Sequence, residues 1–341
     1  MAARNIADFI HFPAAHRGHR ASLPPDESLV LITQTLATPA EFMLHHFIHT
    51  ALLNARSVVF ISFMNNYHHH ASSLRKWGLD LTTHKQNGTF TFIDGFSDIL
   101  LPPPSNTTPK PGADPRLYFP DPRTGGGGGG ISSFAPPITT ALKGMNDDPV
   151  LIIEGLETVS ALGLGDANEV LDLVTFLQKF CSTTLLSLPI DPPLLRPLLP
   201  PTTTTPPPPL ERAHALLLTS LAARAFRIIN VEPLSTGRAK DVTGVLRMVR
   251  GGASYIGEEG EGKGEEEGRG EWLFMWVLGG MGSGSYTAGL RCRMSSAWHG
   301  IGVPVLIRNR GRCGGYSSLR RSARRTCTHE PKAAGTENGK C

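Results

Sequence analysis

The sequence lacks any apolar run long enough to cross a membrane. A spanning helix needs about 20 consecutive apolar residues, and no segment of the 341-residue chain approaches that length. The first residues, with Arg4, Asp8 and His11 among them, also lack the apolar core of a secretory signal. We therefore expect a protein of the cytoplasm and nucleus with no membrane partner.

Paired cysteines are also missing. Of the five cysteines, Cys181 stands alone after an apolar helical segment, and the other four lie from Cys292 onward without C-x-x-C spacing. A zinc site or a disulfide framework would need closely paired cysteines. Neither is expected here.

The histidine pattern does not match a metal motif either. His45 and His49 lie four residues apart on one helical face, but His46 stands where a zinc protease needs a glutamate. The run from His68 to His70 follows an apolar segment and is typical of a solvent-exposed helix entry. We expect no metal ion and no cofactor.

Acidic residues are scarce only in the tail. From Ser285 onward eleven basic residues face two acidic ones, whereas the rest of the chain has 22 Lys and Arg against 27 Asp and Glu. The formal net charge of +4 therefore combines a body of −5 with a strongly basic tail.

Short apolar runs alternate with helical patterns along the rest of the chain, which predicts a mostly parallel sheet with helices on both faces. The expected strands are Ser28–Leu36, Ser57–Met64, Phe90–Ile93, Val150–Ile153, Thr183–Leu188 and Ala225–Val231. The expected helices are Ala40–Asn54, His68–Trp77, Asn168–Phe180 and Glu211–Arg224. Val245–Arg250 and Glu271–Leu278 suit a C-terminal antiparallel hairpin. This outline is that of an α/β domain of the RecA-like type.

Composition divides the chain further. Residues 1–27 read as a flexible extension, 28–280 as the RecA-like domain and 281–341 as a disordered basic tail. Proline- and glycine-rich stretches at about 101–146, 192–209 and 251–270 read as disordered insertions.

The first strand is not followed by a phosphate-binding loop. Such a loop reads GxxxxGK followed by Ser or Thr, but here the connection is Ala37-Thr38-Pro39-Ala40-Glu41, without glycine or lysine. Thr38 suits an N-cap and Pro39 a first helical turn. Glu41 places a negative charge where a phosphate would be repelled. We expect no ordinary ATP site.

Two other features could suggest nucleotide chemistry. Glu154 ends an apolar strand, where a magnesium-linked or water-activating carboxylate could stand, but without a phosphate loop a surface carboxylate that caps the next turn is favoured. The run Gly279–Ser285 has glycines at phosphate-loop spacing but lacks the lysine and follows the last strand. It is interpreted as a turn or junction.

The segment Pro233–Arg250 turns between two strands and carries Arg238, Lys240 and Asp241. The two basic side chains could reach a neighbouring subunit or an RNA phosphate, or they could simply belong to a charged β-turn. These three residues are the candidate interface or RNA contacts. No catalytic residue is predicted.

Several segments together resemble Elongator complex subunit six, particularly its fungal form. They read LITQTLATPAEFMLHHFIHTALL, VVFISFMNNYHHHASSLRKWGLDL, FTFIDGFSDIL, VLIIEGLETVSALG and PLSTGRAKDVTGVLRMVRGG. The resemblance implies a RecA-like subunit without working nucleotide motifs. It also implies a hetero-hexameric ring with Elongator subunits four and five, association with the larger subunits, tRNA contact, and support of wobble-uridine modification without enzymatic activity of its own.

The resemblance ends after about Leu278. We interpret the following sequence as the product of an unspliced intron or a shifted reading frame, and the alternative is a genuine basic tail that binds RNA through its arginines. Two alternative functions stay open at this point: a divergent ATPase, and an RNA-binding protein that acts through this tail.

Overall fold

The computed structural model describes residues 10, 12, 23–97, 115, 117, 131–145, 148–198, 206–234 and 244–255, and the backbone of 272–277 and 287–293. All of these belong to one compact unit, Met1–His299. The second unit, Gly300–Cys341, lies outside the described residues.

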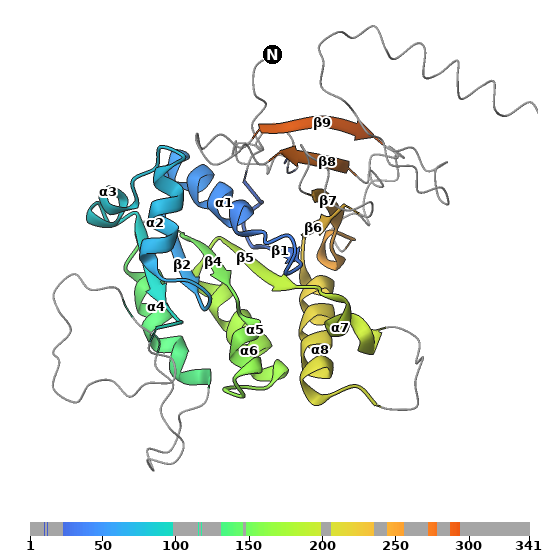
Figure 1. Cartoon of the computed structure of the whole chain (residues 1–341). Helices are drawn as coiled ribbons and strands as arrows, with labels where there is room; N and C mark the ends of the chain where they lie inside the picture. The colour runs from blue at the N-terminus through green and yellow to red at the C-terminus, as the bar shows by residue number, and fades with distance from the viewer. Residues whose placement is uncertain are drawn as a thin grey trace, which may run out of the picture. The chain divides into compact units, whose positions relative to one another are not determined.

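The described strands form one nine-stranded sheet (Figure 1). In chain order they are β1 (Ser28–Gln34), β2 (Val58–Ser62), β3 (Phe90–Asp94), β4 (Val150–Glu154), β5 (Thr183–Pro189), β6 (Arg227–Pro233), β7 (Gly244–Arg250), β8 (Trp272–Val277) and β9 (Thr287–Arg293). Their order across the sheet is β3-β2-β4-β5-β1-β6-β7-β8-β9. The pairs from β3 to β6 are parallel, and those from β6 to β9 are antiparallel. The predicted α/β class, with an antiparallel C-terminal part, is confirmed.

The continuous apolar runs are explained by burial on both faces of the sheet. In β1, Val30 and Ile32 belong to one hydrophobic cluster, and Leu29 and Leu31 belong to another. Because side chains alternate along a strand, each face of β1 packs against a separate layer of helices.

The helices divide between these two layers. One face is covered by α1 (Glu41–Leu53), α2 (Tyr67–Arg75) and α3 (Leu81–Gln86). The other is covered by α4 (Ala135–Lys143), α5 (Glu157–Ala161), α6 (Ala167–Leu177) and α8 (Pro209–Arg224). The shorter elements are η3 (Ile131–Phe134), η4 (Gln178–Phe180), α7 (Pro192–Leu195), η5 (Arg196–Leu198) and η6 (Gly252–Tyr255).

Structure extends into each of the stretches that were interpreted as insertions. The end of the 101–146 stretch forms η3 and α4, which bury Ile131, Phe134, Ile138 and Leu142 against the sheet. Two prolines lie at the start of α4, where the missing amide hydrogen costs nothing. Apolar spacing therefore outweighed the glycine- and proline-rich composition.

The other two stretches also contain helical turns where disorder was predicted. The 192–209 stretch contains α7 and η5, and the 251–270 stretch begins with η6. Strand β9 falls within the tail that was expected to be disordered, and it pairs with β8. In the part of the chain that the structure describes, no helix is both long and apolar enough to span a bilayer.

Candidate functional site at the carboxyl edge of the sheet

The candidate site lies where the parallel strands β1, β2 and β4 end. At this edge β1 turns through residues 35–40 into α1, β2 leads toward α2, and β4 ends in Glu154. In open α/β sheets, ligands bind at the carboxyl ends of the strands. The turn between β1 and α1 therefore occupies the place of a phosphate-binding loop.

The chain's own acceptors hold the amides of this turn. The amide of Leu36 donates to both carboxylate oxygens of Asp191, at 3.2 and 3.1 Å. The amide of Thr38 donates to the carbonyl of Thr35 at 3.0 Å, and that of Ala40 donates to Oε1 of Gln34 at 2.6 Å. A phosphate-binding loop offers its amides to the ligand, whereas these three are already satisfied.

The start of α1 differs from the sequence prediction. Its N-cap is Ala40, which makes no side-chain capping bond, and the helix begins at Glu41. The predicted cap, Thr38, instead shares a hydroxyl hydrogen bond with Thr35 at 2.7 Å. Pro39 consequently precedes the helix rather than lying in its first turn. Glu41 lies in the first turn of α1, as predicted, and the repulsion of phosphate by its carboxylate stays a prediction.

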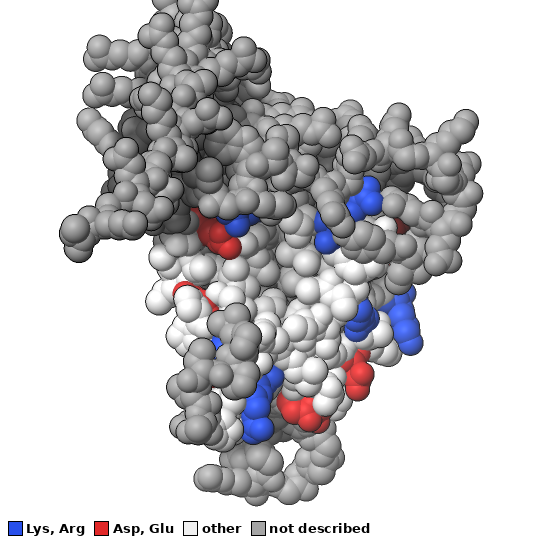
Figure 2. Space-filling view, turned by 90° about the vertical axis from the view of Figure 1, so that its right-hand side faces the viewer, with Lys and Arg blue, Asp and Glu red and all other residues white. Residues whose placement is uncertain are grey.

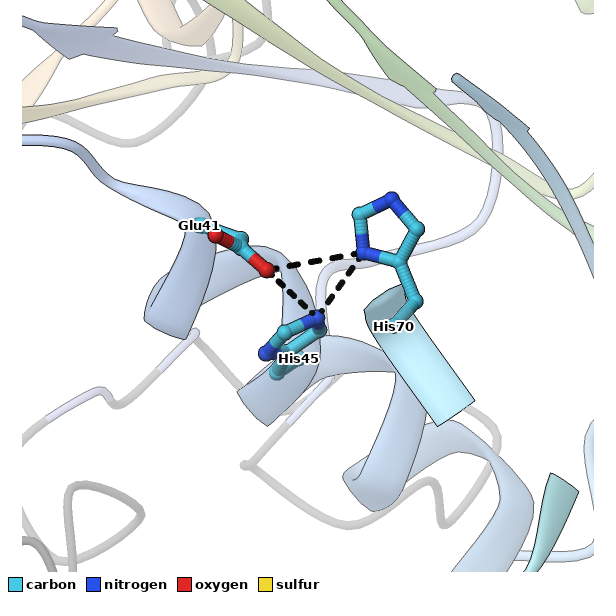
Figure 3. Close-up of side chains that lie close together, drawn as sticks. All are labelled: Glu41, His45 and His70. Atoms are coloured by element: carbon cyan, nitrogen blue, oxygen red, sulfur yellow. Dashed lines mark hydrogen bonds and ion pairs between the residues drawn. The ribbon is translucent and has the colours of Figure 1, made fainter. Parts of the chain in front are cut away.

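Glu41 is also part of a polar cluster between α1 and α2 (Figure 3). Its Oε1 lies 3.3 Å from Nε2 of His45 and 3.6 Å from Nδ1 of His70. The two ring nitrogens are 3.1 Å apart. From the rim of the cluster, Nε2 of His69 contacts the same Glu41 oxygen at 2.7 Å. Three potential ligand atoms thus face one another.

His70 is completely buried, in contrast to the exposed position predicted for the run His68–His70. Its ring packs edge-on against Phe60 of β2 at a centroid distance of 4.7 Å, and it also contacts Phe92 of β3. The sheet topology places β2 and β3 side by side under α2. This tertiary contact has no signature in the local sequence, which shows only three consecutive histidines.

Glu154 is buried as well, and this corrects its interpretation as a surface carboxylate. Its Oε2 accepts a hydrogen bond from the hydroxyl of Ser62 at 2.5 Å and lies 3.2 Å from Nε2 of His70. Ser62 in turn accepts the amides of Met64 and Asn65. The end of β2 therefore holds the end of β4, and the His70 ring lies next to the carboxylate of Glu154.

Burial controls the protonation of His45. Desolvation, together with the positive charges that His70 and His69 would carry, lowers the pKa of His45 to about 3. His45 is therefore neutral at physiological pH, with one ring nitrogen free to act as a lone-pair donor. Neutral imidazole and carboxylate together form a donor set suited to a cation and unsuited to an anion.

The comparison with protein families decides the affiliation of the chain. The family model described as Elongation complex protein 6 matches residues 19–263. The chain belongs to this family. The match spans every strand from β1 to β7 and therefore includes the whole candidate site.

Individual relatives within the family agree. The chain is 28% identical over 236 residues to the Elongator complex protein 6 homolog of Schizosaccharomyces pombe. The aligned region covers 68% of this chain and 81% of that protein. Elongator complex protein 6 of Xenopus laevis is 26% identical over 64% of this chain and 77% of its own length. Elongator complex protein 6 of Homo sapiens is 24% identical over 62% of this chain and 75% of its own length. The resemblance to Elongator subunit six is confirmed, and the relatives that match include a fungal one.

Among solved structures, a KaiC-like protein from Pyrococcus horikoshii is similar to the chain. It has a TM-score of 0.45 and 13% identity and covers 78% of this chain and 91% of that one. A likeness at this level assigns no function.

The predicted contacts Arg238, Lys240 and Asp241 lie outside the described residues. The strands that flank them are described: β6 and β7 pair in register with Pro233 opposite Gly244. Because β6 runs parallel to β1, Pro233 and Gly244 lie at the same edge of the sheet as the turn before α1. The assignment of the three residues stays a prediction.

Proposed function

We propose that this member of the Elongation complex protein 6 family is a non-catalytic ring subunit of Elongator. In this proposal it assembles with subunits four and five into a hetero-hexamer and, with the larger subunits, supports modification of the wobble uridine of tRNA in the cytoplasm and nucleus. The family membership supports a place in the complex. The geometry of the carboxyl edge supports the non-catalytic role.

The observation that carries this role is the self-satisfied turn between β1 and α1. A nucleotide would have to replace the acceptors of Asp191 and Gln34 on the turn amides. It would also bring its negative charge close to the carboxylates of Asp191 and Glu41. Both costs oppose binding, because like charges repel and the displaced acceptors would need new partners.

The same edge offers apolar side chains for a protein neighbour. Leu36 follows β1, Met64 follows β2 and Phe96 follows β3, and their exposed fractions are 88%, 46% and 52%. Large apolar side chains that protrude at one edge are typical of protein contact surfaces, where they bury area on docking. We propose that a neighbouring ring subunit covers this edge.

The face shown in Figure 2 gives less support for a broad RNA-binding patch. On the face shown in Figure 2, the described Lys and Arg side chains lie singly or in small groups, with acidic side chains between them. A phosphate backbone is bound best by clustered basic residues. The proposed tRNA contact therefore centres on the segment that carries Arg238 and Lys240.

Co-expression of the full chain with Elongator subunits four and five, followed by native mass spectrometry, tests the assembly. We expect a six-membered species with two copies of this chain. Leu36→Asp should weaken the ring because it places a charge in an apolar contact, whereas Leu210→Asp, at an exposed leucine on α8, should leave the ring intact. A chain that stays apart from folded partners would contradict the proposal.

A further inference from the structure

We propose that Glu41, His45 and His70 bind a divalent first-row transition-metal ion of the Zn²⁺ type, which joins α1 to α2. The cluster is the one group of three or more potential ligand residues that the described part of the chain brings together, with all ligand atoms within 4.8 Å of one another. The proposal stands on these side chains alone and does not depend on the Elongator role.

The spacing of the three donor atoms fits a tetrahedral ion. Bonds of about 2.0–2.2 Å from zinc to nitrogen and oxygen require ligand atoms roughly 3.3–3.6 Å apart in a tetrahedron. The distances among Oε1 of Glu41, Nε2 of His45 and Nδ1 of His70 are 3.3, 3.6 and 3.1 Å. One face of a tetrahedron is thus already formed, without movement of either helix.

The second nitrogen of His70 supports the same assignment. Its Nε2 lies 3.2 Å from Oε2 of Glu154, a carboxylate that Ser62 holds in place, but the two atoms do not have the geometry of a hydrogen bond. The nearby negative charge favours a proton on Nε2, which leaves the lone pair of Nδ1 on the side of Glu41 and His45. Metal-binding histidines characteristically have a carboxylate next to their other N–H, which favours this tautomer.

Without a cation, the cluster has few protons to share among its acceptors. Nε2 of His69 can donate to Oε1 of Glu41 at 2.7 Å, but the single proton on Nε2 of His45 can bond to only one of Glu41 and His70 well. A divalent ion would satisfy all three atoms at once. Its charge would also balance the two carboxylates, Glu41 and Glu154, in a region where His70 is fully buried and Glu154 nearly so.

The donor set selects the class of ion. Two imidazole nitrogens and one carboxylate oxygen suit Zn²⁺ and its first-row neighbours, whereas Mg²⁺ and Ca²⁺ prefer oxygen ligands alone. The rim of the cluster is accessible to solvent, because His69 is 46% exposed there. Water would fill the fourth position of the ion. The ion would act as a cross-link between α1 and α2.

The test uses the tag-free full-length chain, stripped with a chelator and titrated with ZnCl₂. We expect about one bound zinc per chain and a higher melting temperature with zinc than without. Glu41→Gln should weaken zinc binding by at least tenfold, since it removes a charged ligand with little change of shape. His49→Gln, on the same helix but outside the cluster, should bind zinc like the wild type.

Absence of zinc binding, or equal affinities for the wild type and Glu41→Gln, would overturn the proposal. Zinc-edge X-ray absorption on the wild-type protein keeps the test independent of how the variant folds. Nitrogen and oxygen scatterers at about 2.0–2.2 Å, with an imidazole pattern, are expected. Sulfur scatterers at about 2.3 Å would assign the metal to cysteines instead and would equally overturn the proposal.

Discussion

The amide of Leu36 donates to both carboxylate oxygens of Asp191, so that the start of the turn after β1 is tied to the segment after β5. A carboxylate thus occupies the position that an anionic ligand would need. The bond between Leu36 and Asp191 fixes the turn and also opposes phosphate binding. Removal of the Asp191 carboxylate tests these two effects separately.

Asp191→Ala should reduce the free energy of unfolding by about 1 kcal/mol, because a hydrogen bond to a charged acceptor is lost at a partly exposed site. It should not create a nucleotide site, since Glu41 and the missing lysine are unchanged. Urea unfolding measures the first effect and calorimetric titration with Mg–ATP the second. Asp172→Ala, an exposed acidic residue on α6, is the stability control. Measurable ATP binding by the wild type would contradict the non-catalytic assignment.

Glu157 should make stability fall as pH rises. Burial, with the negative charge of Glu154 as a further cause, raises the pKa of Glu157 from its ordinary value of 4.5 to about 7. Between these two values only the folded state holds the proton, so the free energy of unfolding declines with pH and levels off above about 7.

Glu157→Gln should therefore remove this decline and stabilise the protein at pH 8 by about 2 kcal/mol. Chemical unfolding at pH 5, 6, 7 and 8 measures it. Asp172→Asn is the matched exposed control and should leave the pH profile unchanged. A wild-type profile that rises from pH 5 to 8, with the same rise in Glu157→Gln, would show that Glu157 is ionised in the folded protein.

Gly155 should resist substitution more than Gly163. Both have positive φ, +73° and +70°, so alanine is strained at either position. At Gly155 an added Cβ would also overlap the side chain of Met64, whereas at Gly163 it meets open space. Gly155→Ala should cost about 1–3 kcal/mol more than Gly163→Ala, as measured by thermal or urea unfolding. Equal costs would mean that Met64 moves aside freely.

Arg238→Ala should weaken assembly with subunits four and five or lower the affinity for tRNA. A lost phosphate contact would also reduce the salt dependence of tRNA binding. Native mass spectrometry and tRNA titration at several salt concentrations measure the two effects. Arg75→Ala, an exposed arginine in the last turn of α2, is the control. Unchanged assembly and affinity would remove Arg238 from the candidates.

Much of the sheet could be predicted because each buried strand is a continuous apolar run. The helix predicted over Ala40–Asn54 is α1, and the predicted strand over Thr183–Leu188 is β5. Helix α4 was missed because its apolar spacing follows a long glycine- and proline-rich stretch. The composition of that stretch suggested disorder, whereas tertiary packing stabilises the helix that follows it.

The polar cluster could not be predicted in the same way. His45 and His70 are 25 positions apart and lie on different helices, and they meet only because β1 and β2 place α1 and α2 on the same face. Glu41 was correctly identified as an acidic residue at a helix start. Its two histidine partners are visible only once the tertiary structure brings them to its carboxylate.

The turn before α1 also bears on how a neighbouring subunit would dock. Its bonds to Gln34, Thr35 and Asp191 form within the single chain, so that the loop's conformational entropy is lost during folding rather than during association. Leu36, 88% exposed at this turn, is thereby presented on a preorganised backbone. A partner that buries it would have to order little more than side chains at this turn.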